Sequence, residues 1–165
     1  MMGVGKTTLA KKLANLAHWK HIDLDLEIEK LAGMPVFDIF EAEGQQGFRS
    51  IEQRALNECS AVDDAVISVG GGTPAFYDNA SQMLRSGLCV WLDAPVGMLA
   101  QRLKHAKVER PLLSGLTEDE LLMRLNELMD ERRPYYSQAH MILSMNNLSV
   151  QQAAETLSGI ILRRS

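Results

Sequence analysis

The sequence predicts an α/β fold with a parallel sheet covered by helices, and two observations carry this prediction. Residues 3–8 read Gly-Val-Gly-Lys-Thr-Thr and pass at once into a helix-forming run, the pattern of a loop that binds phosphate at the N-terminus of a helix. Further along the chain, short apolar segments alternate with segments of helical periodicity. Because parallel strands need a crossover between them, usually a helix, this alternation favours a parallel sheet.

Hydrophobic periodicity places the elements of the first half of the chain. Leu9, Leu13 and Leu16 recur at helical spacing after the glycine loop, and the next segments are bounded by glycine and proline. The predicted order is a helix over 5–17, a strand over 21–25, a short helix over 27–31, a helix from 35 to about 44, and a helix over 48–59. Residues 33–60 therefore form a helical insertion between two strands.

The second half alternates in the same way. Thr117 and Ser149 each precede a Glu or Gln by three residues, which is the capping-box pattern that starts a helix. The predicted order is a strand over 65–69, a strand over 88–92, a helix opened by Pro95, a loop over 106–116, and a strand over 140–145 flanked by the two capped helices. Because no linker or internal repeat is visible, we expect residues 1–165 to form a single domain.

Composition and charge exclude several classes of protein. Of the 165 residues, 46% are apolar and 23% are charged, and no apolar run approaches the roughly 20 residues of a membrane-spanning helix. The net charge of -4 provides no basic field for a nucleic acid. Cys59 and Cys89 fall in predicted buried elements, where cysteines are more often core residues than a disulfide or metal pair. We therefore expect a cytoplasmic monomer that partners neither nucleic acid nor membrane.

The glycine loop predicts a site for a nucleoside triphosphate. Gly3 and Gly5 allow backbone N–H groups to close on phosphate oxygens, and Lys6 reaches the β- and γ-phosphates. The hydroxyl of Thr7 joins the coordination shell of Mg²⁺, and Thr8 continues the loop into the helix. These residues alone leave open a chance occurrence of a short motif, so the prediction depends on the rest of the chain.

Two carboxylates end the first predicted strand. Asp23 and Asp25 are two residues apart, and side chains at this spacing share one face of a strand. Ligands of a parallel α/β sheet gather at the carboxyl ends of its strands. One carboxylate can then hold hydrated Mg²⁺ beside Thr7, while the other accepts a proton or hydrogen bond from a substrate hydroxyl. The alternative is a solvated strand end, or Asp25 as the N-cap of the next helix.

Glycines and arginines complete the candidate site. The run Gly70-Gly71-Gly72 comes after a buried strand, where glycine costs chain entropy and lets a ligand approach the backbone closely. A plain tight turn is the alternative. Arg49, Arg110 and Arg132 lie in three different predicted elements. For Arg49 alone, a surface ion pair with Glu52 is the simpler interpretation.

Together these segments closely resemble the shikimate kinase family. The resemblance covers the chain from Gly3 to about residue 160 and rests on the glycine loop, Ile22-Asp-Leu-Asp, Phe48-Arg-Ser-Ile-Glu52, Gly70-Gly71-Gly72, Arg110-Pro-Leu-Leu113 and Glu131-Arg-Arg-Pro-Tyr-Tyr136. It implies a three-layer P-loop kinase fold with five parallel strands, a substrate-binding helical insertion over 33–60 and a mobile lid over 106–116. It also implies transfer of the γ-phosphoryl group of ATP to the 3-hydroxyl of shikimate, on the route to chorismate and the aromatic amino acids.

The resemblance further implies a role for each candidate residue. It assigns the nucleotide to Gly3, Gly5, Lys6, Thr7, Thr8 and Arg102, the last stacked on adenine, and Mg²⁺ to Thr7 and, through water, to Asp23. It assigns the hydroxyls of shikimate and the departing proton to Asp25, the carboxylate of shikimate to Arg49 and Arg132, and the wall of the pocket to Gly70, Gly71 and Gly72. Arg110, in the lid, closes over the transferring phosphoryl group and joins Lys6 and Asp25 in catalysis.

The chain departs from the family pattern near its start. A complete loop of this kind has another glycine five positions before Gly5, and an apolar strand before that. We therefore expect an N-terminally shortened chain in which the first strand of the sheet is missing and two strands lack their shared partner. Gln45 also stands where the family usually has Glu. Two alternatives remain: another small-molecule kinase of the same fold, such as a gluconate-type kinase, or a shikimate-binding domain with impaired catalysis.

Overall fold

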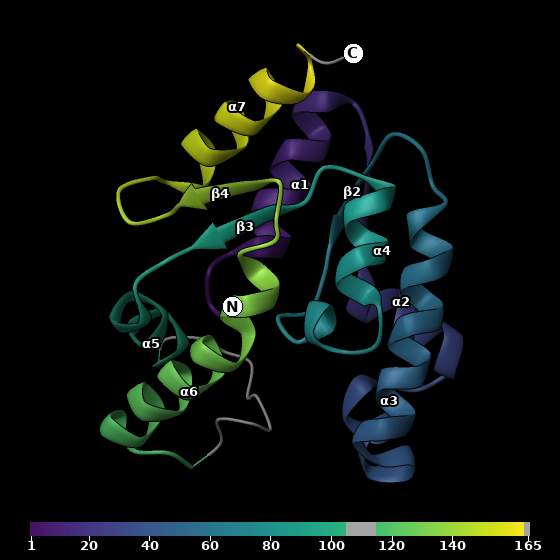
Figure 1. Cartoon of the computed structure of the whole chain (residues 1–165), viewed down its shortest axis with the longest axis vertical. Coiled ribbons are helices and arrows are strands. Elements are labelled where there is room, and N and C mark those ends of the chain that lie inside the picture. The colour runs from purple at the N-terminus through teal and green to yellow at the C-terminus, as the bar shows by residue number, and fades with distance from the viewer. Residues whose placement is uncertain (105–114, 164–165) are drawn as a thin grey trace.

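The structure is a computed structural model that describes residues 1–104 and 115–163 (Figure 1). Its elements in chain order are α1 (Lys6–Ala17), β1 (Lys20–Asp23), α2 (Leu24–Ala32), α3 (Val36–Ser60), β2 (Ala65–Ser68), the 3₁₀-helix η1 (Thr73–Ala75), α4 (Asn79–Ser86), β3 (Val90–Asp93), α5 (Val96–Lys104), α6 (Glu118–Tyr136), β4 (Met141–Ser144) and α7 (Val150–Ile161). Strands alternate with helices, so the predicted α/β class is confirmed.

The strands form two parallel pairs. β1 pairs with β2, with Asp23 opposite Ser68, and β3 pairs with β4, with Asp93 opposite Ser144. The parallel pairing agrees with the sequence. Within the described residues β2 and β3 do not pair with each other, and a cavity of about 550 Å³ is lined by residues of both strands.

Each strand pair carries its own hydrophobic cluster. The larger cluster joins α1, α5, α6 and α7 to β3 and β4, and includes the fully buried Leu99 and Leu125. The smaller cluster joins α2 to α3 and includes Ile28, Leu56 and the buried Cys59. In Figure 1, α7 lies with β3 and β4, whereas α2, α3 and α4 gather on the side of β2. None of the described helices is long and apolar enough to cross a membrane.

Several helix ends form where the sequence predicts them. Gly33 ends α2 with φ of 71°, and Gly44, with φ of 66°, divides α3 into two helical parts; both angles lie in the left-handed region that glycine adopts without strain. Thr117 and Ser149 both form complete capping boxes at the starts of α6 and α7. These local signals therefore set the ends of four helical segments.

The sequence does not predict η1 or α4, which lie between the glycine run and β3. α4 is only eight residues long, and its apolar residues Ala80, Met83 and Leu84 cover about one turn, which is too short a pattern to predict a helix from periodicity. Its contacts with η1 and α3 place it in the fold. Pro74 near the start of η1 is the local signal that favours a helical turn there.

Candidate active site

The glycine loop runs directly into α1. Gly3 and Gly5 adopt φ of 75° and 94°, and a residue with a Cβ would be strained at either angle. Gly5 is the N-cap of α1, and no described side chain makes a capping hydrogen bond at this end. The N-terminus of a helix offers N–H groups and a favourable dipole to an anion. Lys6 lies at this end, where its ammonium group donates to the carbonyl oxygen of Met1 at 2.8 Å.

Thr7 and Asp23 place two hydrogen-bonded side-chain oxygens beside this loop. The Thr7 hydroxyl donates to Oδ2 of Asp23 at 3.0 Å. Mg²⁺ is usually held in such sites by one or two protein oxygens, by phosphate oxygens and by water. The pair fits that pattern, and the described residues include no cluster of three or more His, Cys, Asp or Glu that would form a cage made of protein ligands alone.

Asp23 and Asp25 do not share a strand face, which corrects the sequence prediction. β1 ends at Asp23 and α2 begins at Leu24, so Asp25 lies in the first helical turn. The cause is a cap: Oδ1 of Asp23 accepts from the backbone N–H of Asp25 at 3.2 Å, and this bond satisfies a free N–H of the helix start. Asp23, not Asp25, is therefore the N-cap residue, and it links the Thr7 pair to Asp25.

The glycine run is the point where the predicted substrate residues meet. A Cβ added at Gly70 would lie 3.7 Å from Oδ1 of Asp25, and one at Gly71 would lie 3.1 Å from Nη1 of Arg132. At Gly72 the added atom would come within 2.9 Å of Nη2 of Arg49, closer than real Cβ contacts allow. The three glycines therefore let two guanidinium groups and a carboxylate approach one short stretch of backbone. This close approach accounts for the run of glycines without a plain tight turn.

Arg49 is held at this site by a buried ion pair and not by a surface one. Its Nη1 donates to Oε2 of Glu52 at 2.5 Å, and the two side chains are only 12% and 1% exposed. Its Cζ also lies 5.0 Å from the ring centroid of Phe48 and 4.0 Å from that of Phe76, within the range of cation–π attraction. The Nε of Arg49 is buried and has no hydrogen-bond partner among the described residues.

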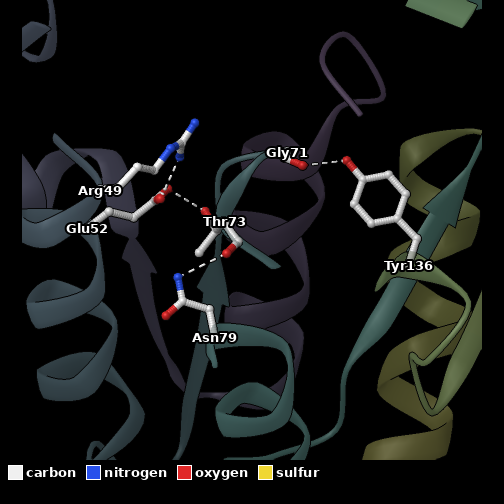
Figure 2. A network of polar contacts seen from close by, with 6 residues as sticks. All are labelled: Arg49, Glu52, Gly71, Thr73, Asn79 and Tyr136. Carbon is white, nitrogen blue, oxygen red and sulfur yellow. Dashed lines mark hydrogen bonds and ion pairs between the residues drawn. The ribbon is translucent and has the colours of Figure 1, made fainter. Parts of the chain in front are cut away.

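Glu52 also belongs to a polar network that the sequence prediction missed (Figure 2). Its other oxygen, Oε1, accepts from the Thr73 hydroxyl at 2.6 Å, and the carbonyl oxygen of Thr73 accepts from the amide of Asn79 at 2.9 Å. Glu52, Thr73 and Asn79 are all almost completely buried. The only sequence signal for this network is the spacing of three between Arg49 and Glu52, which by itself favours a simple surface pair.

Tyr136 closes the other side of the glycine run. Its hydroxyl donates to the carbonyl oxygen of Gly71 at 2.6 Å, as Figure 2 shows. Burial raises the pKa of Tyr136 above its ordinary value, so the phenol remains a proton donor. Arg132 lies one helical turn earlier in α6 and is also buried. Tyr136 stands in the segment that carries the family resemblance, but its link to Gly71 needs the tertiary structure.

The remaining predicted residues lie at the nucleotide end or outside the described residues. Thr8 is exposed in the first turn of α1. Arg102 lies in α5, where its Nη1 donates to the carbonyl oxygen of Val4 at 3.3 Å, so it sits against the glycine loop. Arg110 and nearly all of the predicted lid over 106–116 fall outside the described residues.

Chemically, the site joins the N-terminus of α1, which suits an anion, to a glycine run that has two guanidinium groups beside it. The Thr7–Asp23 pair lies between these two parts, because Asp23 is bonded both to Thr7 at the start of α1 and to the backbone of Asp25. A phosphorylated ligand at the helix end and an anionic hydroxylated ligand at the glycine run suit these two parts. Phosphoryl transfer depends on positioning two ligands and on neutralising charge between them, and groups of this kind could do both.

Comparison with known proteins gives one consistent result. The family model described as shikimate kinase matches residues 2–161. A shikimate kinase of Bacteroides fragilis is 41% identical over 155 residues, which are 94% of this chain and 87% of that protein. The crystal structure of the shikimate kinase from Bacteroides thetaiotaomicron superposes with a TM-score of 0.91 at 36% identity, covering 98% of this chain and 94% of that one. The Acinetobacter baumannii shikimate kinase, solved in complex with shikimate, gives a TM-score of 0.88 at 33% identity, covering 99% and 90%.

Proposed function

We propose a separate role for each residue of the site, because the chain belongs to the shikimate kinase family. It is a kinase that transfers the γ-phosphoryl group of ATP to the 3-hydroxyl of shikimate, in chorismate and aromatic amino acid biosynthesis. The observation that supports our assignment of the site is the meeting of Asp25, Arg49 and Arg132 around the three glycines. Those groups suit a ligand with one carboxylate and several hydroxyls.

Arg49 and Arg132 bind the carboxylate of shikimate in this proposal. Nη1 of Arg49 is engaged by Glu52, whereas its buried Nε lacks a partner among the described residues. A buried N–H without a partner is costly, and a carboxylate supplies the missing acceptor. Arg132 approaches from α6 beside Gly71. A carboxylate between two guanidinium groups gains charge-assisted hydrogen bonds, each worth about 1.5–3 kcal/mol, so the clamp would select shikimate over uncharged cyclic polyols.

Asp25 receives the proton of the attacking hydroxyl. Its carboxylate lies next to the position of Gly70, and the Asp23 cap fixes the start of the helix that carries it. A carboxylate placed in this way orients the hydroxyl and accepts its proton as the new P–O bond forms. The substrate pocket would then be continuous with the phosphate loop.

Lys6 and the loop backbone hold the nucleotide, with Gly3, Gly5 and Thr8 shaping the loop. Thr7 and Asp23 would hold Mg²⁺, Asp23 through water, because they offer the hard oxygen ligands that the ion prefers. When bound, the ion neutralises charge on the phosphate oxygens. Arg102 lies against the loop at Val4, where it would cover the adenine. Arg110 would complete the charge neutralisation from a lid over 106–116.

The organisation of the molecule is part of the same proposal. We take residues 1–165 to be one domain with a substrate-binding insertion over 33–60, acting as a monomer. A cytoplasmic location suits the two free thiols Cys59 and Cys89. Burial raises the pKa of both thiols, which keeps them protonated and weakly reactive.

An acceptor comparison tests the proposal. ADP release is measured with shikimate, with gluconate and with a nucleoside monophosphate, each with and without Mg²⁺. Of the three acceptors, we expect only shikimate to raise the rate of ADP release above the rate without an acceptor, and only when Mg²⁺ is present. Turnover driven by gluconate, or a rate with shikimate no higher than the rate without an acceptor, would contradict the proposed site.

A further inference from the structure

The short segment after the glycine run is linked to Arg49 in two ways, directly through Phe76 and indirectly through Glu52. This segment, residues 73–76, consists of η1 and the next residue, Phe76. The ring of Phe76 faces the Arg49 guanidinium with 4.0 Å between centroid and Cζ. The hydroxyl of Thr73 donates to the same Glu52 carboxylate that pairs with Arg49. We propose that segment 73–76 positions the Arg49 guanidinium, with Phe76 and Thr73 as positioning residues. This inference rests on the proposed role of Arg49 as a carboxylate-binding residue.

The ion pair with Glu52 does not by itself fix the plane of the guanidinium. Only one bond, from Nη1 to Oε2, joins Arg49 to Glu52, and a single bond leaves the fork free to rotate about it. Bidentate recognition of a carboxylate needs the planar fork in one orientation. The face of the Phe76 ring, whose centroid lies 4.0 Å from Cζ of Arg49, restricts that rotation. The contact with Phe76 therefore sets which edge of the planar Arg49 guanidinium faces the glycine run.

Phe48 cannot replace Phe76 in this role. Its ring centroid lies 5.0 Å from Cζ of Arg49, compared with 4.0 Å for Phe76. Phe48 is buried and stacked on Phe40 at 4.3 Å between centroids, so it serves the core of α3 as well. Phe76 is half-buried and lies just after η1. Its ring contacts the Arg49 guanidinium and stacks on no other described aromatic ring.

Thr73 anchors the segment that carries Phe76. Its side chain is 0% exposed, its hydroxyl reaches Oε1 of Glu52 at 2.6 Å, and its carbonyl oxygen accepts from Asn79. The Glu52 carboxylate therefore accepts one bond from α3 and one from η1 (Figure 2). Loss of the Thr73 bond would leave Oε1 buried with one partner fewer and would free the carboxylate to turn away from Arg49.

Matched variants at Phe76 test the proposal. Phe76→Leu keeps an apolar side chain but removes the ring, whereas Phe76→Tyr keeps the ring. The dissociation constants of shikimate and of its uncharged carboxamide are measured by calorimetry, with thermal unfolding as the check on folding. We expect Phe76→Leu to weaken shikimate binding about 2- to 30-fold and to leave carboxamide binding nearly unchanged. Phe76→Tyr should bind both ligands like the parent chain.

A second pair of variants, at Thr73, tests the proposal if Phe76→Leu does not fold. Thr73→Val removes the hydroxyl at nearly constant shape, and Thr73→Ser restores it. Thr73→Val should likewise weaken shikimate more than the carboxamide, and Thr73→Ser should recover the difference. Equal weakening of both ligands by Phe76→Leu and Thr73→Val would show that the segment only supports the fold, and would overturn the proposal.

The Arg49→Ala background separates this inference from the proposed function. In that background Phe76→Leu should have no further effect on the shikimate dissociation constant, because the group that it positions is absent. If Arg49→Ala leaves the preference for shikimate over the carboxamide intact, the proposed binding of the shikimate carboxylate by Arg49 is wrong. If Arg49→Ala removes that preference but Phe76→Leu and Thr73→Val do not reduce it, only the positioning proposal fails.

Discussion

The hydroxyl of Tyr136 donates a hydrogen bond of 2.6 Å to the carbonyl oxygen of Gly71. Arg132 precedes Tyr136 by four residues in α6, and residues at this spacing share a helix face. Both side chains reach the same glycine, because a Cβ at Gly71 would lie 3.1 Å from Nη1 of Arg132 and 3.3 Å from the Tyr136 oxygen. One turn of α6 thus brings both a cation and a hydrogen-bond donor to the same glycine.

Removal of this hydroxyl should affect substrate binding as well as stability. Tyr136→Phe removes that donor from the partly buried Gly71 carbonyl, at a cost of about 0.5–1.5 kcal/mol of unfolding free energy. It should also raise the KM for shikimate more than the KM for ATP, because the glycine run loses its tether. Urea denaturation and steady-state kinetics measure the two effects. Tyr135→Phe is the matched control, since Tyr135 is exposed and precedes Tyr136 directly; a similar loss in both variants would contradict this account.

The close approach of Arg49 to Gly72 predicts a steric defect. In Gly72→Ala the new Cβ would lie 2.9 Å from Nη2 of Arg49, so the guanidinium must move and shikimate binding should weaken by roughly 10-fold or more. Calorimetric titration with shikimate measures this. Gly97→Ala is the control: nothing lies within 4 Å of its added Cβ, and Gly97 lies within α5, where Ala is the better helix former. Unchanged shikimate affinity in Gly72→Ala would show that Arg49 does not need its present position.

Loss of either clamp arginine should act mainly on affinity. Arg49→Ala or Arg132→Ala removes charged hydrogen bonds to a carboxylate that does not change during the reaction. Each should therefore weaken shikimate binding about 10- to 100-fold, with a smaller change in kcat. Steady-state kinetics with varied shikimate give both constants. A large fall in kcat at constant KM would instead place the arginine at the transferring phosphoryl group.

Asp25 should show the opposite pattern. Asp25→Asn keeps the size of the side chain but removes the proton acceptor, so kcat should fall by about 100-fold or more while the KM for shikimate changes less. Steady-state kinetics under the same conditions measure both constants. Asp38→Asn is a suitable control, because Asp38 is exposed and lies in the first turn of α3, as Asp25 lies in the first turn of α2. If Asp25→Asn retains its kcat, another group accepts the proton.

The fold can be predicted from the sequence where local signals decide the structure. Gly33, Gly44 and the two capping boxes mark helix ends through their own backbone angles and side-chain bonds. The predicted boundary after Asp23 is wrong because the cap competes with continuation of the strand, and the apolar pattern does not show which one wins. η1 and α4 escape prediction because their position depends on contacts with α3 and α6.

The site is predictable by residue type but not by contact. The sequence indicates Arg49, Arg132 and the glycine run as separate features, and their meeting at one place is a tertiary result. Glu52 and Tyr136 are not among the predicted site residues, because their roles are hydrogen bonds to groups distant in the sequence: Thr73 for Glu52, and Gly71 for Tyr136.

A crystal structure with shikimate and a non-hydrolysable ATP analogue tests the central claim most directly. The claim is that the glycine run seats the acid end of the substrate between the two arginines. We predict the shikimate carboxylate within hydrogen-bond distance of Arg49 and Arg132, and the 3-hydroxyl within hydrogen-bond distance of Asp25. A carboxylate that turns instead toward Lys6, or a shikimate ring that lies away from Gly70, Gly71 and Gly72, would contradict the account.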